Sequence, residues 1–326
     1  MSADGAPDAV FAGAAVWDTV AQLPRFPAAD GRVLAEEIVE SGGGPAATAA
    51  VAYARLAPDR PRPALIAAVG DDHRAALIRE GLAAENVDTS QIVTVPGSPS
   101  ASCVILVDRP RGSRAICTRP GPALRIDPGS AAARAVLSAR IVLVDHLGLP
   151  AVEPLLAGLP EGAPRPLVCQ DAGNLAIGRC PAGIDVFVPT LDALREAYGE
   201  RDVTALLDAA RADGARYVVA TDGPNGAYAA DDLGVHRVEG HHDVEVRSTL
   251  GAGDVFHGAL VAALAHALPL PEALAYANAA AALSCRALDG RGGIPDDAET
   301  RALAARLPAI PLTRRPAGST DEQGAM

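Results

Sequence analysis

A run of small residues directly before an acid is the part of this sequence best suited to chemistry. The run is Thr249-Leu250-Gly251-Ala252-Gly253-Asp254, and a helical segment follows it. Backbone N–H groups at a helix start are unpaired and carry the positive end of the helix dipole. Because Gly251, Ala252 and Gly253 bring little or no side chain, an anion can approach those amides. The turn is therefore predicted to hold the oxygens of a phosphoryl group during its transfer.

Asp254 is the candidate catalytic residue of this turn. A carboxylate beside a bound phosphoryl group can accept the proton of an attacking hydroxyl. The simpler interpretation is that Asp254 only stabilises the first turn of its helix, where the dipole favours a negative charge. Glycine-rich turns between a strand and a helix are common, so the local pattern leaves both interpretations open.

The elements that must position this turn alternate between short apolar runs and alanine-rich helical segments. Strands are expected at Val10–Val16, Ala64–Val69, Ile141–Val144, Leu167–Cys169, Val186–Val188 and Tyr217–Ala220. Helices are expected at Pro45–Leu56, His73–Ala84, Val255–Ala267 and Pro271–Ala287. This alternation predicts a Rossmann-like α/β fold with a central, mostly parallel sheet flanked by helices.

Two strand-like segments, Arg32–Glu40 and Ser102–Thr118, break the alternation, and the second contains the turn signal Asp108-Arg109-Pro110-Arg111-Gly112. We expect them to form a small β-sheet lid that excludes water when it closes. The alternative is two surface hairpins with no special role. The chain is thus expected to form one domain over residues 9–310, with lid segments at about 32–41 and 102–119 and a disordered tail at 311–326.

Composition limits the partners. The net charge is −12, and no run of basic residues is long enough to make a stripe, so nucleic acid is not expected to bind. The five cysteines include no C-x-x-C pair, which argues against a disulfide framework. No segment reaches about 18 consecutive apolar residues, and the N-terminus lacks a signal-peptide pattern. We expect a cytoplasmic protein with no membrane partner.

From about Val10 to Pro295 the chain resembles the ribokinase-like, or PfkB-type, sugar kinases. Gly-Ala-Gly-Asp, followed by Phe256 and Gly258, is similar to the C-terminal signature of that family. The resemblance implies the ribokinase fold and the cofactor ATP. It also implies that Asp254 is the catalytic base and that the amides of Gly251, Ala252 and Gly253 form the anion hole.

A second match implies a substrate site. Gly42–Ala50 resembles the Gly-Gly pair with which the family begins its first long helix. The resemblance assigns substrate contacts to Gly43, Gly44 and Thr48, although many members carry Asn where Thr48 stands. It also assigns a contact to Asp18, expected at the end of the first strand, whose carboxylate can accept from two adjacent hydroxyls.

A third match implies a nucleotide site. Thr221–Gly226 resembles the family's turn Thr-x-Gly-x-x-Gly, about thirty residues before Gly251. The implied phosphate or ribose contacts are Thr221, Gly223 and Gly226. Asn278 and the glycine-rich loop at 290–295 resemble the part of the family that lies beside adenine.

Within the family, Gly42–Ala52 and Gly251–Leu260 look most like bacterial 6-deoxy-6-sulfofructose kinases. This resemblance implies a cation near a sulfonate. Arg32 stands where those kinases place a Lys after a Gly, and Arg119 is a second candidate substrate contact. Two other contacts expected there, an Asn and an Arg, are not matched.

The metal ions are less well specified. The family's Asn-x-x-Glu motif is replaced by Thr190-Leu191-Asp192-Ala193. Mg²⁺ is still expected, because it bridges and neutralises ATP phosphates with few protein ligands, but its protein contacts stay unassigned. Ser248 stands where many members carry an Asp near a K⁺ site, so K⁺ stays open as a cofactor.

Together these patterns predict an ATP-dependent kinase acting on a primary hydroxyl of a ketose-like sugar, such as 6-deoxy-6-sulfofructose or fructose. The alternatives are a kinase of the same fold for a nucleoside or sugar acid, and a catalytically silent nucleotide- or sugar-binding regulator. Aromatic residues make up 3% of the chain, which disfavours a pocket that stacks on a nucleobase. Exposed edges of the lid strands predict a homodimer formed through the lid.

Overall fold

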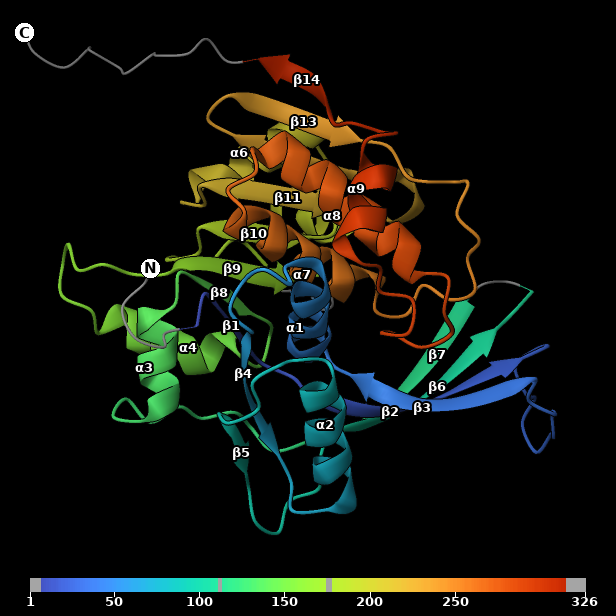
Figure 1. Ribbon diagram of the computed structural model, residues 1–326. Coiled ribbons are helices and arrows are strands. Elements are labelled where there is room, and N and C mark those ends of the chain that lie inside the picture. The colour runs from blue at the N-terminus through green and yellow to red at the C-terminus, as the bar shows by residue number, and fades with distance from the viewer. Residues whose placement is uncertain (1–6, 111–112, 174–177, 315–326) are drawn as a thin grey trace, which may run out of the picture.

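The computed structural model describes residues 7–110, 113–173 and 178–314, and a ten-stranded sheet forms its centre (Figure 1). Its parallel strands are Ala9–Ala12 (β1), Ala64–Val69 (β4), Ile92–Thr94 (β5), Ile141–Val144 (β8), Leu167–Ala172 (β9), Val186–Pro189 (β10) and Tyr217–Thr221 (β11). Antiparallel strands at one edge are Ala227–Asp231 (β12), Gly234–Val238 (β13) and Ile310–Arg314 (β14). The order is β14-β13-β12-β11-β10-β9-β8-β1-β4-β5, which confirms the predicted mostly parallel body.

Helices cover both faces of this sheet, and its central strands are therefore buried along their whole length. One face is covered by Pro45–Leu56 (α1), His73–Ala84 (α2), Ala252–Ala265 (α7) and Leu270–Ser284 (α8). The other is covered by Ala131–Ser138 (α3), Leu149–Ala157 (α4), Leu191–Tyr198 (α5) and Val203–Ala212 (α6). The last described helix, Asp297–Ala304 (α9), packs against α8. No helix in the described ranges is long and apolar enough to cross a membrane.

A second, four-stranded sheet projects from the body at the predicted place of the lid and is called the lid sheet below (Figure 1, lower right). Its strands are Val16–Leu23 (β2), Glu37–Gly43 (β3), Ser102–Asp108 (β6) and Ser113–Arg119 (β7). The order is β3-β2-β6-β7, with β2 and β6 parallel and the outer pairs antiparallel. The smaller sheet expected from the sequence is therefore present, with one strand more than the two segments suggested.

The prediction of a single strand at Val10–Val16 is wrong. The body strand β1 ends at Ala12, and the chain then turns into the lid strand β2. The chain leaves the body sheet at Gly13 because the carboxyl group of Asp145 lies against this glycine. A Cβ atom at Gly13 would be only 2.1 Å from Asp145 Oδ1. The same carboxylate accepts a hydrogen bond from the amide of Ala14 at 2.7 Å. This buried contact diverts the chain out of the body sheet.

Other boundaries also differ from the prediction. In the expected lid segment Arg32–Glu40, strand β3 starts only at Glu37. Residues 311–314, expected in a disordered tail, belong to β14, because they pair with β13 at the edge of the body sheet. The rest of that tail, 315–326, and residues 111–112 of the predicted lid turn lie outside the described residues.

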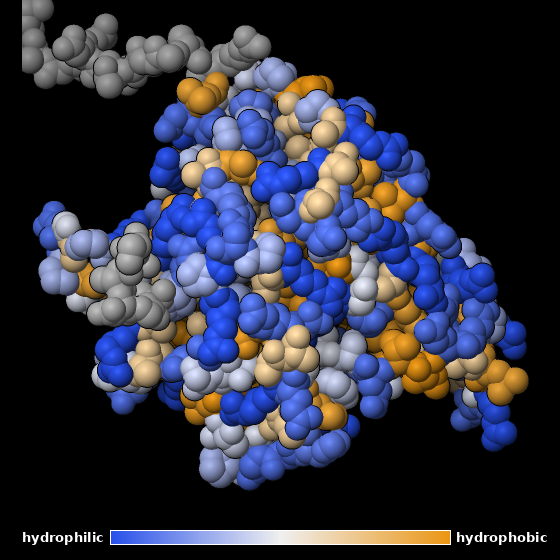
Figure 2. All heavy atoms as spheres, viewed as in Figure 1, coloured by the Kyte–Doolittle hydropathy of each residue, from blue (hydrophilic) through white to orange (hydrophobic). Residues whose placement is uncertain are grey.

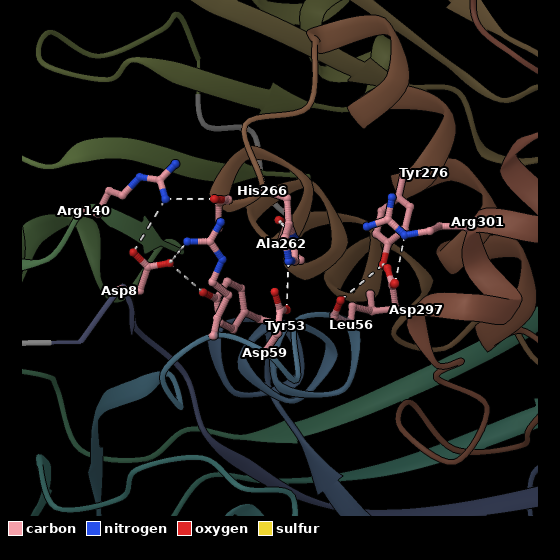
Figure 3. A network of polar contacts seen from close by, with 12 residues as sticks. Asp8, Tyr53, Leu56, Asp59, Arg140, Ala262, His266, Tyr276, Asp297 and Arg301 are labelled. Carbon is pink, nitrogen blue, oxygen red and sulfur yellow. Dashed lines mark hydrogen bonds and ion pairs between the residues drawn. The ribbon is translucent and has the colours of Figure 1, made fainter. Parts of the chain in front are cut away.

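A polar network joins the C-terminal ends of α1 and α7 (Figure 3). Tyr53 donates to Asp8 at 3.2 Å, and burial raises the pKa of this tyrosine above its usual value. Arg140 lies 3.7 Å from the other oxygen of Asp8 and donates to the carbonyl of Ala265 at the end of α7. His266 contacts the carboxylate of Asp59 at 2.9 Å. These contacts fix the two helices to β1 at the end away from their glycine-rich starts.

The two helices also pack unusually closely along their length. A Cβ atom at Gly258 of α7 would lie 2.3 Å from the carbonyl oxygen of Ala49 and 2.7 Å from the Cβ of Ala52, both in α1. Only glycine permits this approach, since real Cβ atoms do not come so near to backbone. The contact sets how far apart the starts of α1 and α7 lie.

We therefore predict that Gly258→Ala lowers the free energy of unfolding by about 1–3 kcal/mol through overpacking. The matched control is Gly81→Ala in α2, where a Cβ would meet nothing within 4 Å and helix propensity should add up to roughly 1 kcal/mol. Urea unfolding followed by circular dichroism measures both. Equal effects of the two substitutions would contradict the close α1–α7 contact.

Candidate active site

The glycine-rich turn lies at the start of α7, as the sequence pattern requires. Gly251 caps the helix in the left-handed region with φ of 74°, and a Cβ there would lie 2.8 Å from Gly290. The helix begins at Ala252. A Cβ at Gly253 would meet nothing within 4 Å, so the space beside this first turn is open. The amide of Ala252 donates a long hydrogen bond to the carbonyl of Thr249, at 3.4 Å, and the open space lies beside Gly253. A helix N-terminus that faces open space suits an anion such as a phosphate.

Asp254 lies in the first turn of α7 with part of its side chain reachable by solvent. Removal from bulk water raises the pKa of this carboxyl well above its usual value, and the negative charges of Asp171, Asp145 and Asp18 raise it further. The positive charge of Arg291 opposes them. A carboxylate with a raised pKa is a stronger base, which suits proton removal from a hydroxyl.

Asp18 was expected to close the first strand, but it lies within the lid strand β2, beside Cys103 of β6. Its side chain is buried over Gly43, and its Oδ1 has no hydrogen-bond partner among the described residues. Burial raises the pKa of Asp18 to about 6, against the opposing effects of Cys103 and Arg291. An acceptor without a partner is costly, and a sugar hydroxyl would satisfy it.

The start of α1 forms the wall beside Asp18. Gly44 caps this helix with φ of 92°, and a Cβ there would lie 2.6 Å from the carbonyl oxygen of Ala14. A Cβ at Gly43 would lie 2.0 Å from Asp18 Oδ2, so glycine is what lets this carboxylate sit against the strand. Thr48 is fully buried one turn into the helix. The structure therefore brings together four of the predicted substrate residues.

Arg291 belongs to this group through its side chain, a contact that the sequence did not predict; the place of its loop beside adenine stays a prediction. Its Nε donates to Thr48 Oγ1 at 3.3 Å and its Nη2 to the carbonyl of Gly43 at 3.0 Å. Removal from water lowers the pKa of Arg291 to about 10, so it stays charged at neutral pH. The loop passes Gly251 at Gly290, and the Arg291 side chain extends from there to Thr48 in α1. An arginine flanked by glycines was the signal available in the sequence.

Asp145 is a second residue that the sequence analysis missed. It follows the buried strand β8 and accepts hydrogen bonds from the amides of Ala14 and Ala46 through Oδ2, and of Leu147 and Gly148 through Oδ1. Burial raises its pKa although these amides favour the charged form. It thereby ties the chain after β1 to the start of α1. An acid directly after an apolar strand was the available signal.

The predicted nucleotide residues lie around β11. Thr221 ends that strand, and the short 3₁₀ helix Gly223–Asn225 (η1) follows. Gly226 has φ of 102°, and a Cβ there would lie 2.1 Å from the carbonyl oxygen of Val238. Asn278 of α8 donates to the carbonyl of Glu239 at 2.9 Å, directly after that residue. The turn at Gly226 and helix α8 thus both contact the backbone at Val238–Glu239. The side-chain amide of Asn278 is used in this contact.

Arg32 and Arg119 are not brought to Asp18 by any contact among the described residues. Arg32 is exposed in the loop between β2 and β3. Arg119, at the end of β7, lies 3.4 Å from Asp72 and donates to the carbonyl of Ser100. Their predicted role in reading a substrate anion therefore gains no geometric support.

Comparison with known proteins identifies the family. The sequence profile of the pfkB family carbohydrate kinases matches residues 7–297. The chain belongs to this family. Its predicted membership is thus confirmed, and with it the prediction of an ATP-dependent carbohydrate kinase.

Individual relatives agree with this family. An ATP-dependent ribose-1-phosphate kinase from Halopiger xanaduensis is 30% identical over 308 residues, which cover 91% of this chain and 96% of the relative. A ribokinase from Thermotoga maritima superposes with a TM-score of 0.75 at 21% identity, over 92% of this chain and 100% of its own. An Arabidopsis thaliana ribokinase, complexed with ribose and ATP, gives 0.74 at 22% identity, over 92% and 99%. These two structures show the fold.

Asp18 yields a prediction about stability in this pfkB kinase. Its pKa rises from 3.8 to about 6 on folding, so the folded state loses stability as the pH rises from about 4 to 6 and stays penalised above that. Asp18→Asn removes the charge and should raise the melting temperature at pH 8, with a gain that vanishes near pH 4. Asp192→Asn, whose parent side chain is 91% exposed, is the matched control without such a gain. A difference in melting temperature between the Asp18 variant and wild type that is the same at pH 4 and pH 8 would contradict the raised pKa of Asp18.

Proposed function

We propose that the protein transfers the γ-phosphoryl group of ATP to a primary hydroxyl of a sugar or sugar derivative, with Asp254 as general base. The observation that supports this best is the position of Asp254. It stands in the first turn of α7, beside the open amides of the Gly251–Gly253 turn and within electrostatic range of Asp18. The carboxylate of Asp254 thus lies near both the glycine-rich turn and Asp18, the residue proposed to accept hydrogen bonds from the sugar.

Each residue has a step in this mechanism. Asp18 accepts hydrogen bonds from sugar hydroxyls through its unsatisfied Oδ1 and so orients the ring. Asp254 takes the proton of the attacking hydroxyl, and that oxygen forms the new P–O bond as the bond to ADP breaks. The amides at Gly251–Gly253 stabilise the charge on the transferred group. The lid strands β2 and β3, which carry Asp18 and Gly43, shield the sugar from water.

ATP and Mg²⁺ fit the residues present in different ways. The open space at Gly253 and the turn at Thr221–Gly226, with Gly223 and Gly226 in the left-handed region, can receive phosphate and ribose. Acidic, His and Cys side chains of the described ranges form no group arranged to hold a metal. Mg²⁺ would therefore be held mainly by the ATP phosphates, where it neutralises their charge. Ser248 accepts from the amide of Leu250, and we make no proposal for K⁺.

We propose a class of acceptor, a sugar or sugar derivative with a primary hydroxyl, and two compounds of this class to test first. The Halopiger xanaduensis relative is named for ribose 1-phosphate, and the sequence motifs resemble kinases of 6-deoxy-6-sulfofructose. Both compounds carry a primary hydroxyl and an anionic group elsewhere on the sugar. A neutral ketose such as fructose, a sugar acid and a nucleoside complete the set of acceptors, and a silent regulator would act on none.

Asp254→Asn should lower kcat on the best acceptor by on the order of 10³-fold, because general base catalysis is lost. ATP binding, measured by calorimetry, should change little. The assay is ADP release with Mg·ATP and ribose 1-phosphate, 6-deoxy-6-sulfofructose, fructose, 2-keto-3-deoxygluconate or adenosine. Glu153→Gln, at an exposed position of α4, is the matched control. A variant that keeps more than about a tenth of the wild-type rate would refute the role of Asp254 as base, since less than about 1.4 kcal/mol of barrier would then be involved.

The lid is also proposed to join two copies of the chain. Its apolar side chains Ile38, Val104 and Ile116 are exposed, and every described residue of β7 is exposed. Figure 2 shows hydrophobic atoms gathered at the lid end of the molecule, lower right. Edge strands with exposed apolar residues are usually covered by a partner, and a second lid would cover them.

Ile116→Arg should therefore shift a wild-type dimer towards monomer, because it places a charge on the covered surface. Ile310→Arg is the matched control, because its parent side chain on β14 is 50% exposed, against 48% for Ile116. Light scattering after gel filtration measures the mass of each variant. A monomeric wild type, or an intact Ile116→Arg dimer, would contradict the proposal.

A further inference from the structure

We propose that Arg291 binds an anionic group of the acceptor, a phosphate or a sulfonate, so that the substrate class is an anionic sugar. The inference rests on the proposed kinase function and goes beyond it, since it names the class of acceptor and the side chain that selects it. Neither Arg32 nor Arg119, the two arginines that the sequence suggested for this role, is in contact with the site.

Arg291 is exceptional among the basic residues. All 28 Lys and Arg residues of the chain are arginines, and Arg291 is the buried one among those that the structure describes, at 7% exposure. The other described arginines lie partly or fully in solvent. Burying a guanidinium costs free energy unless a negative group compensates it. The carboxylates of Asp18, Glu85, Asp254 and Asp289 supply part of this negative charge through space, and none of them accepts a hydrogen bond from the guanidinium among the described contacts.

The protein gives this guanidinium only neutral hydrogen-bond acceptors within the described ranges. Nε donates to a hydroxyl, that of Thr48, and Nη2 to a carbonyl, that of Gly43. The carboxylates of Asp18 and Asp254 act on it through space. Nη1 lies against Gly42, where a Cβ would be 2.1 Å away, and the described hydrogen bonds leave it unused. A guanidinium with spare donors suits the paired oxygens of a phosphate or sulfonate.

The loop around Arg291 is held in place by its own contacts. Asp289 Oδ1 accepts from the amides of Arg291 and Gly292 at 2.8 and 2.7 Å. Arg55 donates to the carbonyls of Arg291 and Ile294, and a two-point ion pair with Glu85 fixes Arg55. The guanidinium is thus preorganised, which lowers the entropy cost of binding a ligand.

The charges of the site explain why an anionic acceptor needs this residue. Asp18, Asp145 and Asp171 surround Asp254 and all add negative potential there. An anionic sugar would be repelled by these carboxylates, whereas a neutral sugar would not. Arg291 is the cation that opposes them at Asp254 and at Asp18. The rival interpretation, a purely structural link between the loop and α1, predicts equal loss of neutral and anionic acceptors when the arginine is removed.

The test compares acceptors that differ by one anionic group. The pairs are ribose 1-phosphate with ribose, and 6-deoxy-6-sulfofructose with fructose. Within each pair the ratio of kcat/KM is measured on one preparation, so a partly folded variant does not distort it. Wild type should favour the anionic member of one pair, and which pair it is separates a phosphate from a sulfonate. Arg291→Gln should lower that preference at least about tenfold, mainly through KM, whereas Arg286→Gln, which breaks a surface pair with Glu299, should leave it unchanged.

If Arg291→Gln does not fold, Arg291→Lys serves in its place, because it keeps the charge but loses the fork, and it should lower the preference several-fold. An unchanged preference in the variant that folds would overturn the inference, as would a wild type that uses neutral and anionic members equally well. Both outcomes would leave the proposed kinase function intact. That function fails separately, if wild type releases ADP with no acceptor of the panel.

Discussion

The close contact between α1 and α7 is the constraint on which the site depends. Gly258 of α7 lies directly against Ala49 and Ala52 of α1, so close that a Cβ atom at Gly258 would not fit. The N-terminal ends of both helices then open towards the same space, one with Gly43 and Gly44, the other with Gly251 and Asp254. The helix start proposed to bind the sugar and the helix start proposed to bind the phosphoryl group thereby lie side by side.

The charges gathered at this meeting point are unbalanced, and the chemistry uses the imbalance. Carboxylates from β2, from the ends of β8 and β9, and from α7 converge, so that Asp254 holds its proton more tightly than a surface aspartate. A carboxylate with a raised pKa is a stronger base, which suits the role proposed for Asp254. Arg291 opposes this negative charge at Asp254 and at Asp18, which is the basis of its proposed role in binding an anionic acceptor.

Sequence patterns predicted the body well where one periodicity dominated. Pro45–Leu56, His73–Ala84, Ala64–Val69 and Ile141–Val144 are found with the predicted bounds, because burial and helix propensity agree there. The lid was predicted only in part, since its strand β2 was not expected. Its strand β2 follows β1 after three residues, and the break at Gly13 is imposed by Asp145, 132 residues away in the chain. The contacts of Arg291 were not predicted for a similar reason, since its partners Thr48 and Gly43 are 243 and 248 residues distant. Long-range side-chain contacts of this kind leave no local pattern.

The polar atoms left without partners in the site have a cost that other parts of the fold must offset. Asp18 Oδ1 is buried without a hydrogen bond among the described residues, and Asp171 Oδ2 and His257 Nδ1 have only their mutual contact at 3.5 Å. At the opposite ends of α1 and α7 the polar groups are instead well paired, as in the Asp8–Tyr53–Arg140 network (Figure 3). The same two helices are thus fixed by polar contacts at their C-terminal ends, whereas Asp18 Oδ1 stays without a hydrogen bond near their N-terminal ends. A ligand that satisfies Asp18 Oδ1 would stabilise the folded state, by an amount that grows with the logarithm of the ratio of its concentration to its Kd.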